Sequence, residues 1–252
     1  MKKKFKLSPM LLLAIAAVLL LGSTVGSTQA ALLYYSDNYV ASVEVSNIGA
    51  SLVENGSVIN FRDYNKDGGW NTPEDEDTAV LMKDFLGEDE KLIPGKTYKE
   101  EIQVANSGAI DTYVRVLIKK YWVDETGKKE SVKLDPAYIV LVPSASEKWV
   151  KSDASTDERE IFYYTDVLVA SETDDKALTD AVITGIKIDE AVSKEIIQYI
   201  DENKVTYEYK YDGCSFVVEA EVQAIQTHNG VDAIKSAWGV DAVITDGKLS
   251  VN

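Results

Sequence analysis

The densest group of side chains that could do chemistry lies at residues 63–74, which read DYNKDGGWNTPE. Oxygen-bearing residues occupy positions 1, 3, 5, 9 and 12 of this segment, and a glycine occupies position 6, as in a calcium-binding loop. Carboxylate and amide oxygens are the ligands that Ca²⁺ prefers. The segment is therefore a candidate calcium site, and calcium is the one cofactor that the sequence indicates. Its ligands would be Asp63, Asn65, Asp67, Asn71 and Glu74.

Three neighbouring features differ from a helix–loop–helix calcium site. Residues 57–62, which precede the loop, alternate as a strand does. Trp70 stands where an aliphatic side chain is usual, and Pro73 would disturb a helix that followed the loop. An acidic, solvated loop without metal is the alternative interpretation.

The chain offers few residues for catalysis. It contains one histidine, His228, and one cysteine, Cys214, so a His-x-x-x-His zinc pair and an internal disulfide are both excluded. A strand is expected between these two residues, and it would hold them too far apart to act as base and nucleophile. We expect no catalytic residues and a protein that is not an enzyme. Cys214 would be a buried strand thiol and His228 a turn residue.

A group of aromatic residues raises the alternative of carbohydrate binding. Two of them, Tyr163 and Tyr164, are adjacent in an expected strand, so at most one could face outward. Core packing explains the group better. Its members are Tyr121, Trp122, Trp149, Tyr163 and Tyr164.

The first thirty residues have the composition of a secretory signal peptide. Four lysines precede an apolar run at residues 10–21, and small polar residues lead to cleavage after Ala30 or Ala31. The run is shorter than the roughly 20 residues of a membrane-spanning helix. We therefore expect a signal peptide at 1–30, a single domain at 31–252, no membrane span after cleavage, and a secreted or cell-surface protein.

The chain is strongly acidic. It has 26 lysines and arginines against 42 aspartates and glutamates, a formal net charge of −16. Removal of the four lysines of the leader would bring the charge to −20. Such a field repels nucleic acid and anionic lipid and favours cations and basic partners, so nucleic acid is not an expected partner.

Alternation with a period of two dominates the chain from residue 39 onward and indicates many short strands. Turn-forming pairs such as Asn55-Gly56 and Pro94-Gly95 separate the runs. We predict an all-β fold with a few short helices, an antiparallel β-sandwich that is jelly-roll-like. Asp212-Gly213, between alternating runs at 207–211 and 216–222, predicts a long hairpin.

Helical spacing occurs in three short segments. The second is ambiguous, because Ile196 to Ile200 fits a helix face and also fits a strand paired to the residues from 207 onward. The three segments are 78–86, 189–200 and 231–238.

The most characteristic stretch is LIPGKTYKEEIQVANSGAID at residues 92–111, which runs into Tyr-Val-Arg-Val at 113–116. Here a Pro-Gly turn would begin a strand, an Asn-Ser-Gly turn would end it, and the next strand would pair back in register. Together with Thr28-Gln29-Ala30-Ala31, this stretch resembles the family of exported matrix proteins typified by TasA and camelysin. Residues 43–52, 216–226 and 232–239 are similar to further parts of that family.

The resemblance implies a secreted structural protein of the extracellular or biofilm matrix, either a fibre subunit or an accessory. In such fibres an N-terminal strand of one subunit inserts into the next, and the donor here would be residues 32–45. The resemblance also implies processing by a dedicated signal peptidase, and self-association or related matrix subunits as partners. Physically, a sandwich that lacks an edge strand exposes backbone groups that a neighbouring segment can pair.

Two other functions stay open. One is a monomeric calcium-dependent cell-surface adhesin or binding module that uses the loop at 63–74. The less favoured one is a camelysin-like metallopeptidase, against which the single histidine argues.

Overall fold

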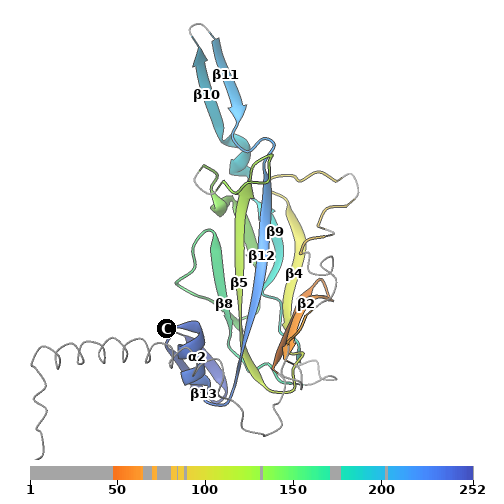
Figure 1. The fold of residues 1–252 in the computed structure, drawn as a ribbon. Helices are drawn as coiled ribbons and strands as arrows, with labels where there is room; N and C mark the ends of the chain where they lie inside the picture. The colour runs from red at the N-terminus through yellow and green to blue at the C-terminus, as the bar shows by residue number, and fades with distance from the viewer. Residues whose placement is uncertain are drawn as a thin grey trace, which may run out of the picture. The chain divides into compact units, whose positions relative to one another are not determined.

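Two antiparallel β-sheets packed face to face form the body of the protein (Figure 1). The structure is a computed structural model that describes residues 48–64, 70–72, 81–83, 85–87, 90–130, 133–170, 177–201 and 204–251. All of these residues lie within one structural unit, residues 46–252. The predicted signal peptide and the predicted donor segment at 32–45 lie outside the described residues.

The first sheet has six strands in the spatial order β3-β2-β1-β4-β9-β6, and neighbouring strands run antiparallel. Asn55 and Gly56 join β1 to β2 with φ angles of 48° and 85°, the positive values that a tight two-residue hairpin requires. The strands are β1 (Gly49–Glu54), β2 (Ser57–Tyr64), β3 (Trp70–Asn71), β4 (Thr97–Ala105), β6 (Ile139–Pro143) and β9 (Ile183–Ile188).

The second sheet has four strands in the order β12-β5-β8-β7. Its longest ladder joins β5 to β12 without a bulge, from Thr112 opposite Gln226 to Val123 opposite Ser215. The strands are β5 (Thr112–Val123), β7 (Trp149–Lys151), β8 (Arg159–Tyr164) and β12 (Ser215–Gln226).

Alternate residues of both sheets point into a common core. Val114, Val116 and Ile118 of β5 are 0% exposed, as are Ile102 and Val104 of β4. A fully buried side chain of this size contributes about 1.5–3 kcal/mol relative to an exposed one. The two packed sheets confirm the predicted all-β fold.

The outer face of the second sheet is covered as well. Helix α2 (Gly230–Trp238) and the hairpin of β13 (Ala242–Thr245) and β14 (Lys248–Val251) pack on it and form a second apolar cluster. Tyr163 and Tyr164, on opposite faces of β8, are therefore both buried, at 3% and 4% exposed. Trp122 is buried as well, so three of the five aromatic residues pack in the core, and Tyr121 and Trp149 are partly exposed.

The ambiguous segment at 189–200 divides into two elements. The Asp189 side chain accepts a hydrogen bond from the Ala191 N–H at 2.9 Å and caps the 3₁₀-helix η4 (Glu190–Lys194). Strand β10 (Ile196–Asp201) follows and pairs with β11 (Lys204–Tyr209) in a separate two-stranded sheet. The strand interpretation is thus confirmed for the second half.

The predicted hairpin around Asp212-Gly213 is wrong. Gly213 does make a turn, with φ 70°, but β11 pairs with β10, and β12 pairs with β5. Pairing with β5 lets β12 turn one face into the core, whereas every residue of β11 is exposed. Burial of a whole strand face outweighs a local turn preference.

The Asn-Ser-Gly segment also differs from its prediction, because β4 and β5 belong to different sheets. The chain crosses from one sheet to the other here, and hydrogen bonds of Asn106 stabilise the connecting segment. Its side-chain amide donates to the carbonyls of Ile110 at 2.8 Å and Leu168 at 3.0 Å, and its carbonyl accepts from the Gly108 N–H at 2.9 Å. The 6% exposed Asn106 therefore satisfies its polar atoms inside the corner.

The remaining helical predictions have different outcomes. Helix α2 confirms the prediction at 231–238, and it ends at Gly239 with φ 71°. Residues 81–83 form a turn and residues 85–86 a bend, so the helix predicted at 78–86 is wrong for these residues, and the rest of that segment lies outside the described residues. Within the described ranges, no helix has the length and apolarity needed to cross a membrane.

Candidate functional site

The candidate calcium loop connects two paired strands. Asp63 and Asn71 are direct partners in the β2–β3 ladder, so the backbone brings positions 1 and 9 of the loop opposite each other. Asn65, Asp67 and Glu74 lie outside the described residues. The segment before the loop is strand β2, as the alternation at 57–62 predicts. Among described residues, no group of three His, Cys, Asp or Glu side chains could hold a metal ion.

Cys214 lies in the turn just before β12 and is half-buried, so its prediction as a buried strand thiol is wrong. Burial raises the pKa of its thiol, and the nearby carboxylates of Asp124 and Glu125 raise it further. The thiol therefore stays protonated at neutral pH, which disfavours nucleophilic chemistry. His228 is exposed in the turn before α2, as predicted, at the far end of β12 from Cys214.

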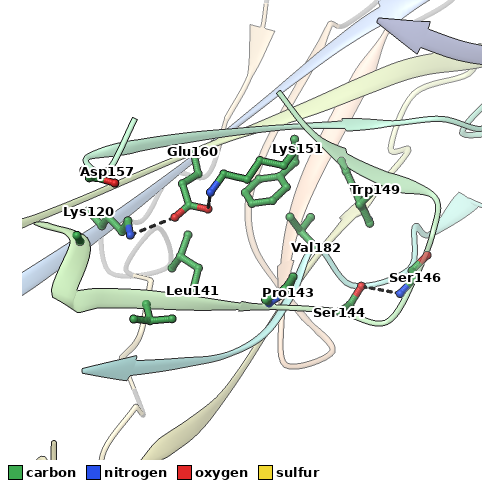
Figure 2. Close-up of a pocket in the computed structure, with 13 residues that line it drawn as sticks. Lys120, Leu141, Pro143, Ser144, Ser146, Trp149, Lys151, Asp157, Glu160 and Val182 are labelled. Atoms are coloured by element: carbon green, nitrogen blue, oxygen red, sulfur yellow. Dashed lines mark hydrogen bonds and ion pairs between the residues drawn. The ribbon is translucent and has the colours of Figure 1, made fainter. Parts of the chain in front are cut away.

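One rim of the sandwich, between β6 and β7, contains a pocket of about 430 Å³ (Figure 2). Apolar side chains of both sheets and of the loop before β9 line much of it, including Leu141, Phe162 and Val182. Trp149 closes one side, because its indole N–H donates to the Asp180 carbonyl at 2.8 Å. The pocket is therefore the open end of the core between two edge strands.

The charged groups of this pocket neutralise one another. Lys120 is 4% exposed and forms an ion pair with Glu160 at 3.1 Å. Lys151 contacts the other Glu160 oxygen at 2.6 Å, as Figure 2 shows, and Lys120 also donates to the Ile139 carbonyl at 2.5 Å. Because both carboxylate oxygens and the buried ammonium are already used, few groups remain to recognise a polar ligand. The pocket is a weak candidate for small-molecule chemistry.

The opposite rim presents the longest edge strand. In the part of the chain that the structure describes, β12 forms a ladder with β5 alone. Strand β1 lies next to β12 across the two layers but belongs to the other sheet. A long, regular edge of this kind is a template for pairing with another segment.

The direction of the β12 backbone groups follows from the β5 ladder. Lys120 donates its N–H to Glu158, on the β8 side, so even-numbered residues of β5 face β8 and odd-numbered residues face β12. In the register, odd-numbered residues of β5 stand opposite odd-numbered residues of β12. Even-numbered residues of β12 therefore direct their N–H and C=O groups to the rim. These residues are Phe216, Val218, Ala220, Val222, Ala224 and Gln226.

The side chains along this rim are apolar and incompletely covered. Ala220, Val222 and Ala224 of β12 face the core but are only half-buried, and so are Ala50 of β1 and Ile59 of β2. A further extended segment at this rim could cover these side chains and pair with the β12 backbone at the same time. Glu219 and Glu221 on the other face of β12 are exposed.

A buried acid near the end of β1 is the site residue that the sequence analysis missed. Glu100 of β4 is 1% exposed, and its Oε1 atom has no hydrogen-bond partner among the described residues. Burial, and then a hydrogen bond to Glu54, raise its pKa to about 8. Glu54 also accepts a hydrogen bond from the Met82 N–H at 2.6 Å. Alternation gave a signal, since Glu100 has the same parity as the buried Tyr98 and Ile102.

Comparisons with protein-family models, with curated proteins and with solved structures give no match.

Proposed function

We propose that this chain is a secreted structural protein of the extracellular or biofilm matrix. It acts as a fibre subunit or accessory and assembles by accepting an extended segment from a neighbouring copy along the β12 rim. The observation that carries the proposal is the β12 edge, where the even-numbered backbone groups point to the rim and the core-facing apolar side chains are only half-buried. A segment that adds a strand there gains hydrogen bonds and apolar burial in one step.

The donor proposed from the sequence suits this acceptor. Residues 32–45 read LLYYSDNYVASVEV and contain aromatic and β-branched residues that favour strands. Since β12 has twelve residues, a donor of this length can pair along all of it. Placing it on a neighbouring copy makes a heterologous contact that repeats, which produces a filament.

The resemblance to the TasA and camelysin family supports the same role. It rests on the leader-like first thirty residues and on residues 92–116, and the resemblance also provides the dedicated signal peptidase as a partner during export. The role requires binding and assembly, and no step of it requires catalysis.

The test compares two forms of the chain, one without residues 1–30 and one without residues 1–45. Both contain every described strand, and circular dichroism checks that both fold. Negative-stain electron microscopy and light scattering should show filaments for the longer form and no filaments for the shorter one. A synthetic peptide of residues 32–45 should bind the shorter form.

Two results would contradict this proposal. One is equal assembly of both forms. The other is a longer form that stays monomeric at neutral pH, at acid pH and with added calcium.

A further inference from the structure

The β10–β11 hairpin extends from the sandwich with all of its described residues exposed (Figure 1). Partners across the ladder lie on the same face, and they are Ile196 with Tyr209, Gln198 with Tyr207, and Ile200 with Val205. We call these six residues the apolar hairpin face. Five of them are large and apolar, and their exposed fractions are Ile196 53%, Ile200 75%, Val205 47%, Tyr207 61% and Tyr209 62%.

The charged residues of the two strands lie on the other face. Asp201, Lys204 and Glu208 share that face with Thr206 and with two exposed apolar side chains, Ile197 and Tyr199. The apolar hairpin face has no charged residue, although charged residues make up 27% of the chain. This separation indicates a binding surface, because a hairpin exposed to water on both sides would not need an apolar face.

The base of the hairpin is anchored in the body. Lys210 donates its N–H to the Glu195 carbonyl at 2.9 Å, and the two side chains form an ion pair at 3.4 Å. The next residue, Tyr211, is 9% exposed and packs against Trp122, with ring centroids 4.9 Å apart. A two-stranded hairpin alone is only marginally stable in water, so this anchor holds the apolar hairpin face in place for a partner.

We propose that the apolar hairpin face binds the same face of a second copy of this chain, with a two-fold axis between the two hairpins. Five half-exposed aliphatic and aromatic side chains offer on the order of 500 Å² per copy. Two facing copies would then bury about 1,000 Å², near the lower limit of specific interfaces. A face that pairs with itself satisfies two-fold symmetry without any complementary charge.

The extended hairpin also reduces the electrostatic repulsion between two acidic chains, because it keeps their bodies apart. A strand of six residues spans about 20 Å. Contact through the hairpins keeps the bodies, with a net charge of −16 per chain, apart by more than the screening length of about 8 Å at physiological salt. The same net charge disfavours an anionic membrane as the partner. This contact is independent of the β12 rim and of residues 32–45.

The test uses two matched substitutions in the full chain, measured by sedimentation equilibrium. Ile200→Lys places a charge on the apolar hairpin face, and Ile197→Lys makes the same change on the opposite face. We expect a wild-type dimer in the micromolar range, which Ile200→Lys weakens by at least about tenfold and Ile197→Lys by less than about twofold. Circular dichroism checks that both variants fold.

A second measurement locates the contact. Gln198 lies in the middle of the apolar hairpin face. In a Cys214→Ser background, the Gln198→Cys variant should form a disulfide-linked dimer under mild oxidation. Thr206→Cys, on the opposite face, should not.

Three outcomes would overturn the proposal. The wild-type chain could be monomeric at its highest soluble concentration, or the two lysine variants could weaken the dimer equally. Alternatively, a monomeric chain could float with phosphatidylcholine vesicles in a manner that depends on Ile200, which would identify a lipid surface as the partner. Deletion of residues 1–45 should leave this dimer intact. A failure of the dimer proposal can therefore be distinguished from a failure of the proposed strand-acceptor role of β12.

Discussion

The carboxyl group of Glu100 in β4 is 1% exposed, and burial and the neighbouring carboxyl group of Glu54, at the end of β1, raise its pKa. Two neighbouring carboxyl groups can share a hydrogen bond only if at least one of them keeps its proton. The groups that shift the Glu100 pKa are its burial, Glu54 and Asn55, and no basic side chain is among them. The stability of this buried pair therefore depends on a bound proton. In other buried acids a lysine or an arginine takes that role.

This pair makes the fold more stable in acid. The pKa of Glu100 rises from 4.5 to about 8 because the charged form is desolvated, so between these values the folded chain holds a proton that the unfolded chain has released. Its stabilisation is complete below pH 4.5 and is lost as the pH rises past 8. Urea unfolding from pH 5 to 9 should show stability falling by at most about 1.4 kcal/mol per pH unit.

Glu100→Gln should remove this dependence, because an amide keeps the shape and a donor without a proton to lose. We expect the variant to exceed the wild type at pH 9 by roughly 1–3 kcal/mol. The neighbouring Glu101→Gln is the control, since the Glu101 carboxylate is partly exposed and forms a loose ion pair with the exposed Lys99 at 3.7 Å. A wild-type pH profile that Glu100→Gln leaves unchanged would assign the effect to other groups.

The β12 rim should be blocked by one proline. Val222 directs its N–H to the rim, so Val222→Pro removes a donor for an incoming strand and leaves the β5 ladder paired. Assembly, or binding of a peptide of residues 32–45, should fall by about tenfold or more. Val222→Thr keeps the N–H and should bind as the wild type does. Equal binding by the two variants would show that β12 is not the acceptor strand.

The cover on the second sheet depends on Trp238. Its ring lies 5.6 Å from the Tyr163 ring and 5.0 Å from the Arg115 guanidinium carbon. Trp238→Ala should lower the free energy of unfolding by about 3–5 kcal/mol, because it leaves a cavity and exposes the outer face of β8. Val243→Ala, at a residue that is 52% exposed, should cost less than about 0.5 kcal/mol. Thermal or urea unfolding measures both.

The loop at 63–74 gives a separate prediction from its sequence. Titration calorimetry with Ca²⁺ should show binding heat that Asp67→Ala abolishes, because that change removes the carboxylate at position 5 of the loop. Lys66→Ala, next to it, should keep the heat. If the wild-type chain shows no heat, the calcium-dependent adhesin is eliminated and the matrix role is unaffected.

The sequence by itself determined the local structure. Alternation places strands, and it also gives the correct parity for the buried Glu100. Asn55-Gly56 and Gly239 adopt the positive φ angles that their residue types allow, and the apolar spacing at 231–238 produces α2. These features depend on neighbours in the chain, so a short window of sequence contains their cause.

Only the tertiary structure decided which strands pair and which faces are buried. β12 pairs with β5 and not with β11, its neighbour in the sequence. Between β4 and β5 the chain crosses from one sheet to the other at the buried corner of Asn106. The cover formed by α2, β13 and β14 buries Tyr163. Pairing is chosen by the total apolar surface that all segments bury together, and a period of two is the same whichever partner a strand takes.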